Sequence, residues 1–213
     1  MICLLGGTFD PVHIGHLRCA LDLCAELKLA QVHLLPAQIP PLRELPQASA
    51  QQRLDMLRLA IADEKCLTVD ARELARQGLS YSVDTLAEIR TEIGDQPLLF
   101  CVGADAFAKL QQWHHWESLF DLAHLVVMGR PTSHQPLHPK VAEQLRLRQV
   151  TNPADLATHP QGKIYQTQFV GLGVSASEIR AKIARKESAR YLVPDLVIAY
   201  MQSHHLYQSV VAK

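Results

Sequence analysis

Two histidines stand three residues apart near the start of the chain, in the segment GGTFDPVHIGH at residues 6–16. The apolar run ICLL precedes this segment, which therefore lies where a short strand would give way to a helix. A helix N-terminus carries partial positive charge and N–H groups without helical partners, and both attract phosphate. His13 and His16 would lie on one face of the first turn and could donate to phosphate oxygens. These residue types at this spacing favour a phosphate-binding turn.

The residues in front of the histidines suit the same chemistry. Gly7 ends the strand and lets the backbone come close to a ligand. Thr8 and Phe9 offer backbone N–H groups to an anion, and Asp10-Pro11 turns the chain into the helix. Two simpler interpretations stay open, in which the histidines only cap and pack the helix or bind zinc together with Asp10.

A second segment, VSASEIR at residues 174–180, could also contact phosphate. Ser175 can cap a helix, with Glu178 three residues later completing a capping box. The same hydroxyl could instead contact a phosphate group, and Arg180 would add a cation one turn further on. The overlapping sequence GLGVSA at 171–176 fits the dinucleotide-binding pattern, but no further strand follows it, which argues against an NAD-binding unit.

Apolar strands and amphipathic helices alternate along the chain and must position these segments. The expected strands lie at 2–5, 31–36, 66–70, 97–103, 124–129 and 163–169. The expected helices lie at 14–29, 49–64, 82–94, 175–186 and 194–205, with Ser49 and Ser82 as caps and Gly94 as a stop. This alternation predicts an α/β fold, a Rossmann-like parallel sheet with helices on both faces. We expect residues 1–213 to form a single domain, with a small helical C-terminal part at about 175–213.

Ligands of such sheets bind beyond the carboxyl ends of the strands. This rule places three segments near one crevice, namely 6–16, 36–45 and 103–116. The segment at 37–48 is rich in proline, so it is expected to be a loop that closes over a substrate. The segment at 131–139 is expected to be a loop as well.

The composition limits the classes of function. The 21 basic and 21 acidic residues cancel, which gives no sign of non-specific binding to nucleic acid. No apolar run reaches the roughly 18 residues of a membrane span, and MICLLGG lacks the features of a signal peptide. The five cysteines form no CxxC pair and are expected to be reduced, buried thiols. We therefore expect a cytoplasmic protein that binds neither nucleic acid nor a membrane.

TFDPVHIGH resembles the signature of the nucleotidyltransferase superfamily, (T/G)-x-x-x-x-H-x-G-H. In that superfamily the two histidines hold a nucleoside triphosphate and stabilise charge on its phosphates, which implies that His13 and His16 are catalytic. The segment at 174–180 is similar to the second signature, I-S-S-T-x-x-R, although it departs from it at three positions. The resemblance implies an ATP-binding set made of Gly7, Thr8, Phe9, His13, His16, Gly103, Asp105, Ser175 and Arg180.

Further segments resemble the nicotinate-mononucleotide adenylyltransferase members of this superfamily, across nearly the whole chain. QIPPLRE is similar to N-x-P-P-H-(K/R), with Leu42 in place of the histidine, and implies that Arg43 contacts the pyridine nucleotide. YSVDTL is similar to Y-T-x-x-T-L and implies that Tyr81 and Thr85 lie at the nicotinate site.

VGADAFAKLQQWHHWESL, at 102–119, resembles the V-G-x-D-x-x-x-x-x-x-W-x-x-W region of the same family. The resemblance implies that Asp105 faces the adenosine and metal side. Trp113 offers a flat face for stacking a pyridine ring. Trp116 is expected in the core, and Arg53 and Arg58 are expected to be surface charge.

The resemblance implies that the chain transfers the adenylyl group of ATP to nicotinate mononucleotide by in-line attack, without a covalent intermediate. Mg²⁺ would arrive with ATP, and no metal-binding residues are assigned to the chain itself. The alternatives are a phosphopantetheine adenylyltransferase, a cytidylyltransferase and a non-catalytic nucleotide-binding protein of the same fold. A monomer and a homodimer are equally compatible with the sequence.

Overall fold

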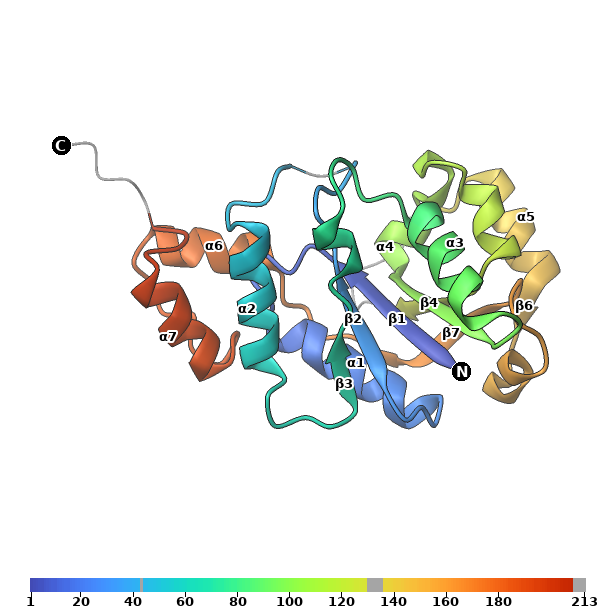
Figure 1. Cartoon of the computed structure of the whole chain (residues 1–213), viewed down its shortest axis with the longest axis horizontal. Coiled ribbons are helices and arrows are strands. Elements are labelled where there is room, and N and C mark those ends of the chain that lie inside the picture. The colour runs from blue at the N-terminus through green and yellow to red at the C-terminus, as the bar shows by residue number, and fades with distance from the viewer. Residues whose placement is uncertain (43, 130–135, 209–213) are drawn as a thin grey trace.

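A seven-stranded sheet lies at the centre of this computed structural model, in the order β3-β2-β1-β4-β5-β7-β6 (Figure 1). All of its neighbouring strands pair in parallel. The structure describes residues 1–42, 44–129 and 136–208. The strands are β1 (Ile2–Gly7), β2 (Val32–Pro36), β3 (Leu67–Val69), β4 (Leu98–Gly103), β5 (His124–Gly129), β6 (Gln149–Val150) and β7 (Ile164–Val170).

Helices cover both faces of the sheet and bury two hydrophobic cores against it. The α-helices are α1 (Ile14–Glu26), α2 (Ala50–Ala60), α3 (Ser82–Ile93), α4 (Ala104–Phe107), α5 (Pro139–Arg148), α6 (Ala176–Ala184) and α7 (Asp195–Ser203). The 3₁₀ helices are η1 (Arg72–Ala75), η2 (Leu110–Gln112), η3 (Trp116–Asp121) and η4 (Pro153–Ala157).

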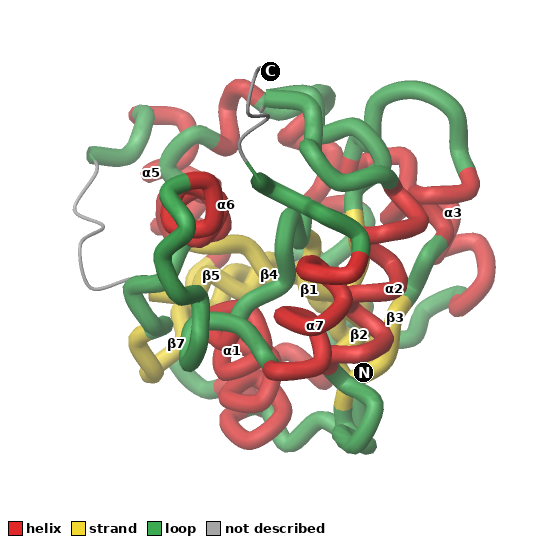
Figure 2. The backbone as a smooth tube through the Cα atoms, turned by 90° about the vertical axis from the view of Figure 1, so that its left-hand side faces the viewer, coloured by secondary structure: helices red, strands yellow, loops and turns green. Residues whose placement is uncertain are grey.

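Alternate strand residues feed the two cores, because successive side chains of a strand point to opposite faces. Cys3 and Leu5 of β1 join the core under α1, α2, α6 and α7, whereas Leu4 joins the core under α3, α4, α5 and η3. Figure 2 looks onto the first of these layers, with α1, α6 and α7 in front of the strands. The predicted fold class, a parallel α/β sheet covered on both faces, is confirmed.

Several predicted element ends are also confirmed, and one cap is wrong. Ser49 caps α2 by accepting from Gln52 N, and Gly94, with φ of 57°, ends α3. The prediction that Ser82 caps α3 is wrong, because Tyr81 is the N-cap residue and its carbonyl oxygen accepts the first helical hydrogen bonds. Helix α2 ends four residues earlier than expected, at Ala60.

The sequence prediction missed α5 and β6, which follow the segment at 131–139. Residues 131–135 of that segment lie outside the described residues, and α5 begins at Pro139. Among the residues of α5, all of which are described, Val141 alone is fully buried. The apolar stripe of this helix is therefore too narrow to be recognised from the sequence.

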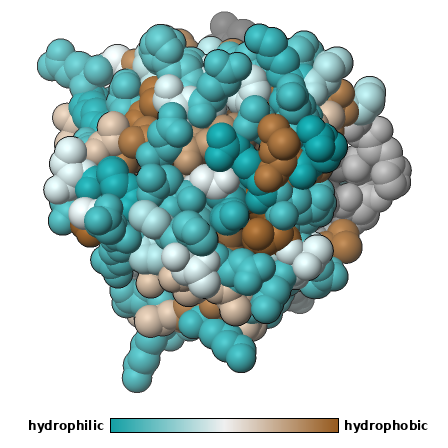
Figure 3. All heavy atoms as spheres, turned by 90° about the vertical axis from the view of Figure 1, so that its right-hand side faces the viewer, coloured by the Kyte–Doolittle hydropathy of each residue, from teal (hydrophilic) through white to brown (hydrophobic). Residues whose placement is uncertain are grey.

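The surface and the cysteines complete the outline of the fold. The face of the molecule that carries α3 and α5 is mainly hydrophilic, with small hydrophobic patches (Figure 3). No helix within the described parts of the chain is long and apolar enough to cross a membrane. The five cysteines, all of them described, form no disulfide; Cys3 and Cys101 are buried as expected, and the other three are partly exposed.

Candidate active site

The strand order creates a switch point between β1 and β4. The chain runs outward from β1 to β2 and β3 and then returns to the other side of β1 as β4. The segments that follow β1, β2 and β4 therefore leave the sheet at one edge, where ligands of such folds bind. A hydrogen bond from Ala37 N to Gly7 O, 2.9 Å long, joins the first two of them. This arrangement agrees with the predicted grouping of 6–16, 36–45 and 103–116.

His13 and His16 cap α1 reciprocally. His13 is the N-cap residue, not a first-turn residue as expected, and its Nδ1 accepts from His16 N at 3.4 Å. In return, Nδ1 of His16 accepts from His13 N at 3.3 Å, and the two rings stack with centroids 3.6 Å apart. Because each Nδ1 accepts a hydrogen bond, a neutral ring carries its proton on Nε2. The two histidines therefore cap α1, and this reciprocal cap fixes the orientation of both rings.

Glycines of the motif make room for these rings. A Cβ atom on Gly15 would lie 3.0 Å from Nδ1 of His13, and one on Gly7 would lie 2.9 Å from Cζ of Phe9. The buried Phe9 ring in turn meets His16 edge-on, with centroids 4.9 Å apart. The space that a side chain at position 7 would need is therefore filled by the ring of Phe9. The predicted approach of a ligand to the Gly7 backbone stays a prediction.

The buried carboxylate of Asp10 accepts hydrogen bonds from three residues, a role that the sequence did not predict. Its carboxylate accepts from the backbone N–H groups of Gln47 and Ala48 at 2.8 and 3.1 Å. It also accepts from the hydroxyl of Tyr207 at 2.6 Å. Burial, reinforced by the Asp10 carboxylate, raises the pKa of Tyr207 well above its ordinary value. Asp10 thus ties the first motif to a loop and to the C-terminal segment.

The two predicted phosphate segments touch each other directly. Nη1 of Arg180 donates to the backbone oxygen of Asp10 at 2.7 Å and lies 3.8 Å from its Oδ2. Ser175 caps α6, because its hydroxyl oxygen accepts from Glu178 N. Within the described stretch 136–208, the return contact from the Glu178 side chain to the Ser175 backbone, which would complete the predicted capping box, is not formed. A hollow of about 370 Å³ lies beside Arg180, lined also by Ser177 and Tyr207.

The residues expected at the acceptor lie around the start of α3. The ring of Tyr81 contacts His114, with centroids 4.4 Å apart. Trp113 is half-buried and meets Phe100 edge-on at 6.2 Å, whereas Trp116 is buried in the core as expected. Within the described residues, Tyr81 provides no side-chain cap to α3. An N-terminus without a side-chain cap therefore lies next to aromatic side chains.

The residues expected to face adenosine lie where β4 ends. Gly103 is the last residue of β4 and the N-cap of α4, and Asp105 lies half-buried in the first turn of that helix. Both therefore stand at the carboxyl edge of the sheet, as expected, and their contacts with adenosine remain predictions. Arg43, the expected contact of the pyridine nucleotide, lies outside the described residues.

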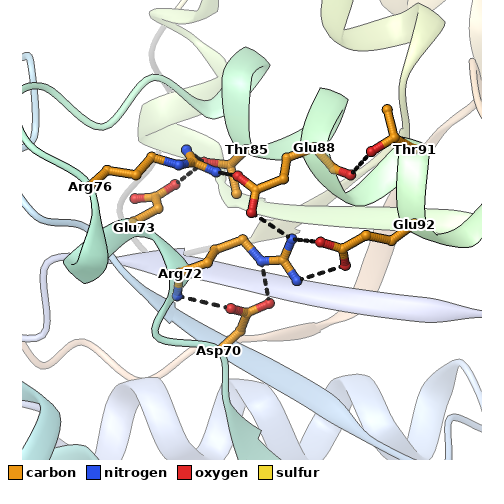
Figure 4. Close-up of polar contacts among 8 residues, drawn as sticks. All are labelled: Asp70, Arg72, Glu73, Arg76, Thr85, Glu88, Thr91 and Glu92. Carbon is orange, nitrogen blue, oxygen red and sulfur yellow. Dashed lines mark hydrogen bonds and ion pairs between the residues drawn. The ribbon is translucent and has the colours of Figure 1, made fainter.

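The side chain of Thr85 belongs to a network of polar contacts within the protein (Figure 4). Its fully buried hydroxyl donates to Glu73 and accepts from Arg76, both at 2.7 Å. Burial raises the pKa of Glu73, and the hydrogen bond from Thr85 opposes this effect. The network continues through ion pairs of Arg72 with Asp70, Glu88 and Glu92. This placement argues against the predicted contact of the Thr85 side chain with a nicotinate ring.

We expect Thr85→Val to lower the free energy of unfolding by about 1–3 kcal/mol, because it leaves buried polar partners unpaired. The loss shrinks as the pH falls, since the hydroxyl stabilises the ionised form of Glu73 and that carboxylate becomes protonated. Urea denaturation at several pH values measures both effects. The control is Thr91→Val on the exposed face of the same helix, which should change stability by less than about 0.5 kcal/mol. Equal losses in both variants contradict the network.

Arg53 is not surface charge, which corrects the sequence prediction. It is 1% exposed, and its guanidinium donates to the backbone oxygens of Thr8, Ala37 and Gln38. Burial lowers its pKa from the ordinary value, and the nearby charge of Asp10 opposes this effect. Arg58, on the same helix, is exposed as expected.

Comparisons with known proteins show the family of this chain. A family model described as cytidylyltransferase-like matches residues 4–182. A "probable nicotinate-nucleotide adenylyltransferase" of Methylococcus capsulatus is 45% identical over 208 residues, which cover 97% of this chain and 99% of the relative. One of Pseudomonas aeruginosa is 44% identical over 209 residues, covering 98% of this chain and 97% of the relative.

Solved structures show the same fold. The nicotinic acid mononucleotide adenylyltransferase of Plasmodium falciparum, complexed with NaAD, has a TM-score of 0.73 at 17% identity. The match covers 97% of this chain and 96% of that one. The same enzyme complexed with APC has a TM-score of 0.71.

Proposed function

We propose that this chain, which belongs to the cytidylyltransferase-like family, transfers the adenylyl group of ATP to nicotinate mononucleotide. The products are nicotinate adenine dinucleotide and pyrophosphate, a step in NAD biosynthesis. Relatives that are 44–45% identical over nearly the whole chain, and named for this activity, support the choice of substrates. The observation that carries the chemistry is the reciprocal His13–His16 cap at the switch point of the sheet.

The triphosphate would lie against the turn between β1 and α1. The N-terminus of α1 and Nε2–H groups of His13 and His16 would face its oxygens, where negative charge grows as pyrophosphate leaves. Arg180 is held beside the same turn by its hydrogen bond to Asp10 and would add a cation. The chain needs no general base, because the attacking phosphate of the mononucleotide is already an anion near neutral pH. Its work is to place that oxygen in line with the α-phosphorus.

The acceptor would bind where α3 begins. The nicotinate ring would stack on Trp113 or Tyr81, and its carboxylate would face the N-terminus of α3, which attracts anions. The phosphate of the acceptor would then point back along the sheet edge toward the turn after β1. In this binding mode the two substrates would lie on opposite sides of the switch point.

Mg²⁺ fits this site as a companion of ATP. No group of three or more His, Cys, Asp and Glu side chains among residues 1–42, 44–129 and 136–208 could hold a metal ion. Mg²⁺ bound to substrate phosphates commonly needs only one or two carboxylates and several waters, and Asp105 stands at the correct edge to supply one. When bound, the ion neutralises charge on the phosphates.

We expect pyrophosphate release from ATP only when nicotinate mononucleotide is present. The assay compares this acceptor with phosphopantetheine and with no acceptor, and it includes a reaction with CTP in place of ATP. Release with phosphopantetheine, or with CTP, would transfer the assignment to another member of the family. Binding of ATP without release in any reaction would favour a non-catalytic nucleotide-binding protein.

A further inference from the structure

A buried arginine of α2 links the two sides of the candidate site. Nη1 of Arg53 donates to Thr8 O at 2.9 Å and to Ala37 O at 2.6 Å, and Nη2 donates to Gln38 O at 3.1 Å. Thr8 belongs to the turn after β1, and the other two belong to the loop after β2. Burying a guanidinium is unfavourable unless hydrogen bonds compensate it, so this planar group holds three carbonyls in fixed places.

The contact with Thr8 determines where the next N–H group points. The cis peptide bond of the motif is Asp10-Pro11, and the Thr8–Phe9 peptide is trans. In a trans peptide the C=O and N–H groups point in opposite directions. Arg53 holds the carbonyl of Thr8, and the N–H of Phe9 is therefore directed away from Arg53. That N–H is one of the expected phosphate donors.

The contacts with the loop fix its first residues against the same turn. Gln38 N donates to Oγ of Ser80 at 2.8 Å, and Ser80 N donates to Ile39 O at 2.9 Å. Arg53 therefore holds this stretch through carbonyl oxygens, and Ser80 holds it through Gln38 N and Ile39 O. At the far end of the loop, the carboxylate of Asp10 binds the N–H groups of residues 47 and 48. The loop and the phosphate turn are joined at both ends.

We propose that Arg53 is a positioning residue for adenylyl transfer, which fixes the phosphate turn and the start of the 37–48 loop in one arrangement. The inference rests on the function proposed above, because it takes the turn after β1 as the ATP site and the 37–48 loop, expected from the sequence to close over a substrate, as a neighbour of the acceptor. Lysine cannot take this role, since its ammonium is a point charge that cannot span three carbonyls in one plane. Arg53 touches neither substrate and acts through the backbone that it holds.

The test compares Arg53→Lys with Arg58→Lys, the same change at an exposed position of the same helix. Pyrophosphate release gives kcat and both KM values, and thermal unfolding gives the folded fraction. We expect Arg53→Lys to raise the KM for ATP and for the mononucleotide and to lower kcat/KM by about 10²-fold, the effect of a misplacement of about 1 Å. Arg58→Lys should stay within about twofold of the wild type.

The outcomes separate positioning from a merely structural role. A structural role lowers the folded fraction, and with it the apparent kcat, at unchanged KM; that result in Arg53→Lys overturns the proposal. If Arg53→Lys does not fold, Ser80→Ala serves as the test variant, because it removes the hydrogen bond from Gln38 N that also holds the start of the loop. Ser80→Ala should raise the KM for the mononucleotide about 3- to 10-fold and leave the KM for ATP unchanged. An unchanged KM for the mononucleotide rejects the proposal. An inactive wild type and Arg58→Lys would instead reject the proposed function.

Discussion

The His16→Ala variant is expected to release pyrophosphate about 10²- to 10³-fold more slowly than the wild type, the usual effect of losing one donor to a developing charge. The imidazole of His16 is held in place from two sides, by its stack on His13 and by the edge of Phe9. Nδ1 accepts the N–H of His13, so the ring proton lies on Nε2. The variant removes this oriented donor. Initial rates at saturating ATP and mononucleotide measure the loss.

The same ring also caps α1, so the test needs controls that separate the two roles. Loss of a capping side chain lowers stability by about 0.5–2 kcal/mol. His16→Gln keeps an acceptor for the N–H of His13, as glutamine does in an ordinary capping box, and should recover stability without recovering turnover. His138→Ala removes an exposed histidine that caps α5 by accepting from Lys140 N, and should leave turnover unchanged. Wild-type turnover in folded His16→Ala rejects the catalytic role.

Local patterns in the sequence predicted most of the elements and most of the caps. Ser49 and Gly94 act on residues three or four positions away, so their residue types suffice to place them. The reciprocal cap of His13 and His16 could not be placed from residue types alone, because each Nδ1 accepts from the backbone N–H of the other histidine. The parallel-sheet rule then placed the segments at 6–16, 36–45 and 103–116 at one edge without any knowledge of contacts.

The interior polar groups could not be predicted, because their partners lie far away in the sequence. Asp10 binds a hydroxyl 197 positions away, and Arg53 reaches Thr8 across 45 positions. A charged residue in a polar helix looks like surface charge until its packing is known. Thr85 shows the same limit, since its hydroxyl is claimed by Glu73. The sequence predicted Arg53 as surface charge and Thr85 as a substrate contact, yet both make their hydrogen bonds inside the protein.

The second large effect expected is on the choice of acceptor. The kcat/KM for nicotinate mononucleotide should exceed that for nicotinamide mononucleotide by about 10²- to 10⁴-fold. The N-terminus of α3 has no side-chain cap from Tyr81 and presents backbone donors beside aromatic rings. A carboxylate accepts from such donors with two charged oxygens and is attracted by the helix dipole, whereas an amide is neutral and offers one acceptor oxygen beside an N–H₂ group that finds no acceptor there. Pyrophosphate release with each mononucleotide measures the ratio.

Two variants of one residue test whether the helix N-terminus is the cause. Tyr81→Asp places a capping oxygen and a negative charge at the N-cap of α3, where both compete with the substrate carboxylate. Selectivity should then fall at least tenfold, because the KM for the acid rises much more than the KM for the amide. Tyr81→Phe keeps the ring that contacts His114 and should keep the selectivity. Equal kcat/KM values of the wild type for the two mononucleotides would exclude a carboxylate site at α3, because a helix N-terminus cannot treat an anion and a neutral amide alike.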